Sequence, residues 1–237
     1  MTATARREPK GARGRAPRDE AGGHGGPPPE PPVRVQSFTR GCVRLFVKRY
    51  FGLRIEGRQH VPGAGPALIV PNHPTYADPF LVGFGTRRFV TWMAWQEAFQ
   101  WPGVGTAIRA LGAYPIDPER PRPSTIKGAL ELLRAGRLLG LFLEGARTAG
   151  QDLLDPPKRG AARIAVIAGV PVVPVSVVGA RSLWPRERRL PRPGKVVVRF
   201  HPPIDPRATG GASAREREER LTEAIVAAIR SGLRPGP

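Results

Sequence analysis

Residues 67–80 constrain the fold of this chain more than any other stretch. Residues 67–70 form a short apolar run with β-branched members, which is typical of a buried strand. The run ends at Pro71, and the chain then passes through Asn72-His73-Pro74. Asp78-Pro79 follows, a pair that favours the start of a helix. The stretch therefore predicts a core strand, a tight turn and a helix in immediate succession.

Two side chains of this turn are candidates for acid–base chemistry. Four residues separate His73 from Asp78, which is enough for the chain to bring the carboxylate back to the imidazole. A neutral imidazole, with a pKa near ~6.5, can accept a proton from an alcohol at neutral pH. A carboxylate on the other ring nitrogen fixes the tautomer and stabilises the imidazolium. The pair predicts a general base, with a plain capping or surface pair as the alternative.

The pattern N-H-x-x-x-x-D-P at Asn72, His73 and Asp78 resembles the signature block of the glycerolipid acyltransferases, the family of the 1-acylglycerol-3-phosphate acyltransferases. Further blocks in the family's order extend the resemblance over roughly residues 40–205. The resemblance implies that His73 and Asp78 are catalytic and that Asn72 supports them. It also implies a glycerol-3-phosphate acyltransferase-like fold.

The second block of the family is similar to residues 112–117, a short strand ending in Asp117. In the family an arginine follows and helps to bind the phosphate of the acyl acceptor. Here Pro118 and Glu119 intervene, so Arg120 is the nearest match and Arg122 is a rival.

The third block, commonly F-P-E-G-T-R-S, is matched at Phe142, Glu144, Gly145 and Arg147. By the resemblance these residues belong to the acceptor and phosphate site. Gly145 lets the backbone approach a ligand closely, and the Arg147 guanidinium can bind phosphate with two hydrogen bonds. Glu144 either orients Arg147 or contacts the glycerol portion of the acceptor.

The fourth block, V-P-V-V-P-V at residues 170–175, reads as a strand near the acyl site. Its prolines favour an edge strand or the start of a strand, with a role in packing and in lining a channel. Other apolar segments predict strands at 53–57, 89–94, 139–143 and 196–200, and helices at 97–111, 124–135 and 161–168. Ser124 is the expected N-cap of one helix, and Ser213 with Glu216 the capping box of a last helix.

This alternation of strands and helices predicts a single α/β domain over residues 36–232, with a mainly parallel central sheet flanked by helices. Residues 1–35 are rich in Arg, Gly and Pro and predict a disordered basic tail, which either touches anionic lipid or has no role. Residues 36–52 predict an amphipathic helix that lies on a membrane or packs on the core. The resemblance implies the membrane contact.

A net charge of +19 indicates nucleic acid, an anionic membrane surface or an acidic substrate as a partner. No zinc-finger, P-loop or RNA-binding aromatic pattern occurs, so we expect no specific nucleic acid. Trp92, Trp95, Phe99 and Trp101 indicate either core packing or a lipid contact. A strongly basic loop at 181–195 is a second candidate for anionic lipid.

The single cysteine, Cys42, fits a reducing compartment, and the other histidines (His24, His60, His201) have no ligand spacing, so we expect no metal. No secretory signal or run of 18 apolar residues occurs. These features predict a cytoplasmic protein, peripheral at the inner face of the cell membrane.

The expected reaction moves a fatty acyl group from acyl-CoA or acyl carrier protein, as substrates rather than cofactors, to a lysophospholipid hydroxyl. Lysophosphatidate is the default acceptor, and phosphatidate the product. Another lipid or natural-product alcohol, a basic nucleic-acid-binding protein and an inactive scaffold remain alternatives. The sequence lacks G-x-S-x-G, which argues against a serine hydrolase.

Overall fold

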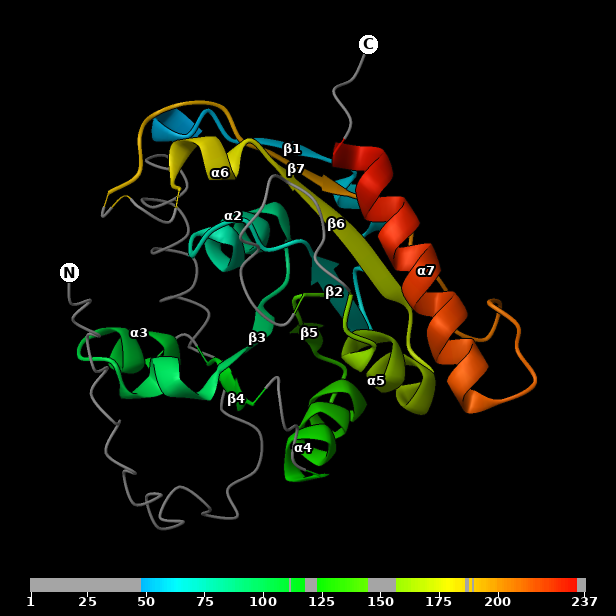
Figure 1. Ribbon diagram of the computed structural model, residues 1–237. Helices are drawn as coiled ribbons and strands as arrows, with labels where there is room; N and C mark the ends of the chain where they lie inside the picture. The colour runs from blue at the N-terminus through cyan, green and yellow to red at the C-terminus, as the bar shows by residue number, and fades with distance from the viewer. Residues whose placement is uncertain are drawn as a thin grey trace, which may run out of the picture.

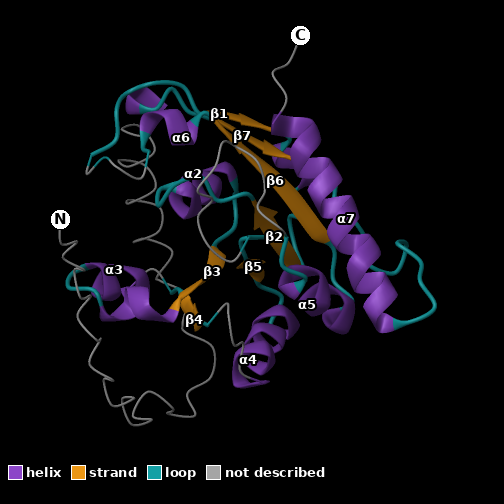
Figure 2. Cartoon of the chain, in the orientation of Figure 1, coloured by secondary structure: helices purple, strands orange, loops and turns teal. Residues whose placement is uncertain are grey.

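The computed structural model describes residues 48–110, 112–117, 123–144, 157–185, 188 and 190–233. Within these residues, seven strands form one sheet in the order β1-β7-β6-β2-β5-β3-β4 (Figures 1 and 2). The strands are β1 (Arg54–Glu56), β2 (Ala67–Pro71), β3 (Val90–Trp95), β4 (Tyr114–Ile116), β5 (Leu138–Gly140), β6 (Val172–Val178) and β7 (Val197–Phe200). The predicted α/β class is confirmed.

The helices alternate with the strands along the chain, as the pattern predicts. They are α2 (Asp78–Gly85), α3 (Val104–Ala110), α4 (Pro123–Arg134), α5 (Gly160–Ala168), α6 (Ala180–Leu183) and α7 (Ala214–Leu233), with 3₁₀ turns η1 (Arg58–His60) and η2 (Gln96–Gln100). Residues 1–47 lie outside the described part. The structure therefore does not test the predicted tail at 1–35, and it describes the predicted helix at 36–52 only from residue 48 onward. Among the described helices, none combines the length and the apolar character needed to span a bilayer.

Strand β2 lies in the middle of the sheet and pairs in parallel with β5 and β6. Strands β3 and β4 extend the parallel part beyond β5. On the other side β7 runs antiparallel to β6, and β1 runs parallel to β7. The carboxyl ends of β2, β3, β4, β5 and β6 therefore share one edge, which is where open α/β sheets bind their ligands.

Alternate residues of the central strands serve two cores. Ala67 and Ile69 pack with Leu81 of α2 on one face of the sheet. Leu68 and Val70 pack on the opposite face, which α4, α5 and α7 cover (Figure 1). The two-residue period of a strand produces this division, because successive side chains point to opposite faces. The four residues of β2 in these cores are fully buried. Packing on both faces of the sheet therefore holds the C-terminal end of β2 in place.

For residues 170–175 the edge-strand alternative is wrong, because β6 lies between β2 and β7. The other alternative, a strand start, is confirmed, since β6 begins at Val172 and Pro174 is its third residue. Val172 exchanges two backbone hydrogen bonds with Ile204, and the Pro174 carbonyl accepts one from the His201 N–H. The Pro174 nitrogen therefore faces residues 201–203, where β7 has ended. Because β7 no longer pairs with β6 at this point, the lack of an N–H on Pro174 removes no hydrogen bond between the two strands.

The sequence predicted a capping residue at the start of two helices, and the structure confirms one of them. The capping box of α7 is confirmed, since the Glu216 N–H donates to Ser213 Oγ and the Ala212 N–H donates to the Glu216 carboxylate. Ser124, by contrast, is not an N-cap, because α4 begins at Pro123. Proline suits this first position, where a helix N–H has no partner within the helix.

A buried serine, held by a histidine, joins α7 to the sheet. The Ser176 hydroxyl donates to the Ile229 carbonyl at 2.8 Å, so it accepts from His201 Nε2–H, also at 2.8 Å. Burial, together with the nearby positive charge of Arg199 and of His60, lowers the pKa of His201 below its ordinary value. The fold therefore favours the neutral ring, as expected for a structural histidine.

Candidate active site

His73 and Asp78 meet at the C-terminal end of β2. Asp78 is the first residue of α2, and its Oδ2 lies 2.8 Å from His73 Nδ1. The Asp78 side chain is fully buried, whereas that of His73 is 15% exposed. A carboxylate can only accept, so Nδ1 carries the proton and Nε2 is left as the basic nitrogen. The turn therefore holds an oriented imidazole with an opening to solvent.

Thr75, which our sequence analysis missed, fixes the carboxylate. Its backbone N–H donates to Asp78 Oδ2 and its hydroxyl donates to Asp78 Oδ1, each at 2.7 Å. The hydroxyl also accepts from the Ala77 N–H. The signal was present in the sequence: Thr75-x-x-Asp78 has the spacing of a capping box, in which residues three apart satisfy one another.

Asn72 holds the start of the turn against β6. Its side-chain NH₂ donates to the Val177 carbonyl at 3.1 Å, and its Oδ1 accepts from the Val177 N–H at 2.7 Å. The buried amide thereby continues the β2–β6 ladder after β2 has ended at Pro71. This geometry supports the expected role of Asn72, because it fixes the backbone just before His73.

Residues that follow β5 complete the surroundings of the imidazole. The Glu144 side chain is buried, and its Oε2 accepts the backbone N–H of His73 at 3.1 Å. The Phe142 ring stacks on the imidazole at 3.8 Å, and Trp92 of β3 stacks on Phe142 at 5.1 Å. Gly140 makes room for this stack, because a Cβ there would overlap the Trp92 ring.

Other predicted site residues lie outside the described part. These are Arg120, its rival Arg122, Gly145 and Arg147. The structure thus brings together Asn72, His73, Asp78 and Glu144, and the phosphate-binding assignments stay predictions. Among the residues it describes, no three His, Cys, Asp or Glu side chains gather as metal ligands would.

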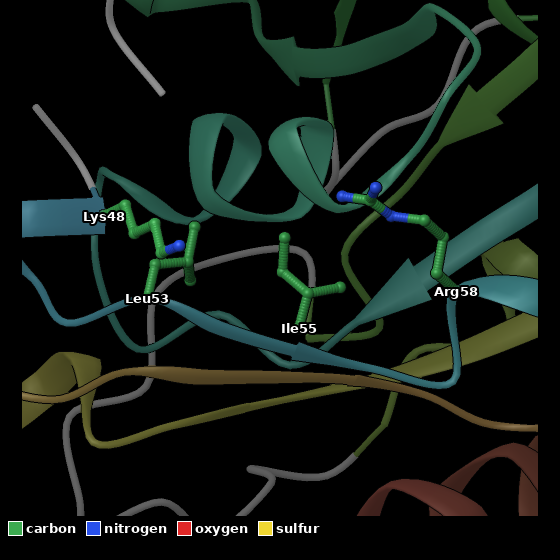
Figure 3. A pocket seen from close by; sticks show the side chains of 4 residues that line it. All are labelled: Lys48, Leu53, Ile55 and Arg58. Carbon is green, nitrogen blue, oxygen red and sulfur yellow. The ribbon is translucent and has the colours of Figure 1, made fainter. Parts of the chain in front are cut away.

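A cavity of about 340 Å³ lies between β1 and α2 (Figure 3). Its described lining consists of Lys48, Leu53, Ile55 and Arg58, and the two apolar side chains point toward α2. Arg58 donates to the carbonyls of Phe84 and Gly85, where a cation complements the helix C-terminus. Arg58 therefore supports α2 from the end opposite to Asp78.

Comparison with known proteins shows which family this chain resembles. The acyltransferase family model matches residues 52–178. A 1-acyl-sn-glycerol-3-phosphate acyltransferase of Bacillus subtilis is 28% identical over 192 residues, covering 81% of this chain and 93% of that protein. One from Streptococcus pneumoniae is 35% identical over 144 residues, 58% of this chain and 50% of that protein. This chain thus spans nearly all of the first relative and half of the second.

A solved structure shares the fold. The crystal structure of the 1-acyl-sn-glycerophosphate acyltransferase of Thermotoga maritima matches with a TM-score of 0.68 and 26% identity, over 86% of this chain and 84% of that one. The sequence left several classes of function open, and these comparisons show that acyl transfer is the right one. The family model covers more than half of the 237 residues, and the chain belongs to the acyltransferase family as an O-acyltransferase.

Proposed function

We propose that this enzyme transfers a fatty acyl group from acyl-CoA or acyl carrier protein to the free hydroxyl of lysophosphatidate, which yields phosphatidate. The names of the relatives from Bacillus subtilis and Streptococcus pneumoniae support this acceptor. The observation that carries the proposal is the 2.8 Å contact between His73 Nδ1 and a fully buried Asp78, with the imidazole partly exposed.

In the proposed reaction, His73 Nε2 removes the proton of the acceptor hydroxyl as its oxygen attacks the thioester carbonyl. The new C–O ester bond forms, the C–S bond breaks, and the thiolate takes up the proton from His73. Asp78 keeps the proton on Nδ1 and stabilises the transient imidazolium. General-base catalysis of this kind contributes on the order of 10²–10⁴ in rate.

We assign the remaining motif residues to positioning and binding. Glu144 holds the backbone of His73, as its 3.1 Å contact suggests. By the resemblance to the family, Arg147 and Arg120 bind the acceptor's phosphate, and Gly145 lets the backbone come close to it. The net charge of +19 supports an anionic membrane as the place where the enzyme meets its lipid. We propose peripheral attachment at the inner face of the cell membrane.

The test follows thiol release from acyl-CoA, and from acyl carrier protein in a parallel series, with a panel of lysolipids. We expect the wild type to prefer lysophosphatidate and His73→Ala to lose at least about 10²-fold in kcat. Asp78→Asn should lose a similar factor, because an amide that donates to Nδ1 imposes the wrong tautomer. His24→Ala, a histidine change in the N-terminal segment, is the matched control. Equal thiol release by the wild type and His73→Ala would refute the proposal.

A further inference from the structure

Three aromatic side chains beside the His73 turn are exposed, and one of them contacts the other two. Tyr76, Trp95 and Trp101 have exposed fractions of 48%, 45% and 38%. The Trp101 ring lies nearly perpendicular to both others, with centroids 6.4 Å from Tyr76 and 6.0 Å from Trp95. We call these three residues the aromatic surface.

Exposed large apolar side chains concentrate on the segments that carry this surface. Phe80 and Val104 are also exposed, on residues 76–80 and 95–104 respectively. In the described part of the chain, the two remaining large apolar side chains that are exposed are Ile167 and Leu190. Single exposed apolar residues are ordinary, but aromatic rings in contact and open to water indicate an interaction site.

The aromatic surface adjoins the reactive base. Tyr76 lies between His73 and Asp78 in the turn itself. Trp95 ends β3 at the edge of the sheet where His73 follows β2. From β3 the chain enters η2 and α3, which stand beside β4, on the side of the molecule away from α5 and α7 (Figure 1). Any partner seated on this surface would therefore lie at the same edge of the sheet as His73.

We propose that the aromatic surface inserts into the headgroup layer of a lipid bilayer and sets the depth at which His73 meets its acceptor. The inference rests on the proposed function, since a lysophospholipid keeps its chain in the hydrocarbon and its hydroxyl among the headgroups. Trp and Tyr are the side chains that settle at this level, with the ring in apolar surroundings and the polar atom in water.

The positive charge of the protein favours a lipid bilayer as the partner that binds the aromatic surface. The net charge of +19 draws the protein to anionic lipid. A cation also lies against the segment between Trp95 and α3: the Arg109 guanidinium stands 5.6 Å from the centroid of Phe99, a neighbour of the aromatic surface in sequence, and donates to the Phe99 carbonyl. This surface differs from the predicted amphipathic helix at 36–52, so the two contacts can be separated by substitution.

The experiment compares the full-length wild type, Trp95→Ala/Trp101→Ala and the control Ile167→Ala, which removes an exposed apolar side chain from α5. Sedimentation with phosphatidylcholine vesicles measures the apolar contribution, because neutral lipid removes the attraction due to net charge. Quenching of tryptophan fluorescence by brominated phosphatidylcholine measures ring insertion. Thiol release is followed with a long-chain lysophosphatidate in vesicles and with a short-chain, monomeric one in solution.

We expect the double variant to bind vesicles about tenfold or more weakly than the wild type, as the loss of two partly buried rings implies. Quenching should fall, and turnover should drop with the vesicle substrate while it stays unchanged with the soluble one. Ile167→Ala should behave as the wild type in every assay.

Vesicle binding by the double variant within twofold of the wild type overturns the inference. An equal loss of turnover on both substrates overturns it too, because the rings would then serve an acyl chain or the fold. Failure of the proposed function gives a different result: the wild type releases no thiol with any lysophosphatidate, whatever the vesicle binding shows.

Discussion

The Phe142 ring lies parallel to the imidazole of His73, with centroids 3.8 Å apart and 17° between the planes. An aromatic face in this position limits rotation of the imidazole and attracts the positive charge that forms on it during proton transfer. Asp78 fixes the same ring through Nδ1. The orientation of the proposed base thus depends on two contacts, one in its plane and one on its face.

Replacing the stacked ring should slow the chemical step. We expect Phe142→Leu to lower kcat by about 3- to 30-fold with little change in KM, since a cation–π contact contributes about 0.5–2 kcal/mol. Phe142→Tyr keeps the ring and is the control. Steady-state thiol release measures both constants, and a kcat for Phe142→Leu equal to that of the control would contradict the role of the stack.

The hydroxyl of Thr75 should matter to both stability and rate. Thr75→Val leaves Asp78 Oδ1 without this donor, and an unsatisfied buried acceptor costs about 1–3 kcal/mol. We expect that loss in the free energy of unfolding by urea, together with a lower kcat. Thr75→Ser restores the hydroxyl and should recover both quantities. If the valine variant matches the serine variant, the hydroxyl does not support the carboxylate.

Glu144 offers a test between positioning and acceptor binding. Glu144→Gln keeps an oxygen that can accept the His73 N–H. If positioning is the role, this variant keeps most of its kcat, whereas Glu144→Ala loses about tenfold or more, as expected for a misplaced base. A raised KM for lysophosphatidate in Glu144→Gln, with kcat intact, would instead place the carboxylate charge in the acceptor site.

The predicted phosphate contact of Arg147 should appear in the acceptor's KM. We expect Arg147→Ala to raise this KM by about 10- to 100-fold, as the loss of a charge-assisted bidentate contact implies. Arg159→Ala is the matched control, because Arg159 pairs with Glu219 on the protein surface. An unchanged KM in Arg147→Ala, measured with lysophosphatidate, would remove Arg147 from the phosphate site.

Stability should fall in mild acid because of His201. Its pKa is lower in the folded protein than in the unfolded chain, where it is about 6.5. As the pH falls below about 6.5, the unfolded chain therefore takes up the proton more readily than the folded protein, and the free energy of unfolding decreases. The stabilisation is complete above this pH.

Urea unfolding at pH 7.5 and pH 5.5 measures this change. His201→Gln cannot titrate in this range and can still donate to Ser176, so its stability should depend less on pH. His60 and Arg199, whose positive charges also act on His201, are unchanged in the variant, so the comparison isolates the titration of His201. A pH dependence equal to that of the wild type would show that another group causes it.

Local features of the sequence were enough to predict β2, the turn and α2. The four-residue spacing of His73 and Asp78 and the prolines around them act within one turn, so the chain determines their meeting without distant help. The capping box of α7 is local in the same sense. Leu221, Ile225 and Ile229 recur at the spacing of one helix face, and all three are fully buried in the core.

Tertiary structure alone decided what surrounds the base. Glu144 contacts a backbone N–H that lies 71 residues away in the sequence. Phe142, which follows β5, stacks on His73, and Trp92 of β3 stacks on Phe142. Pro174 sits inside the sheet because β7 ends beside it. Parallel strands can pair in many orders with the same side-chain pattern. The choice of neighbours depends on how the whole core packs, and no single segment of the chain encodes it.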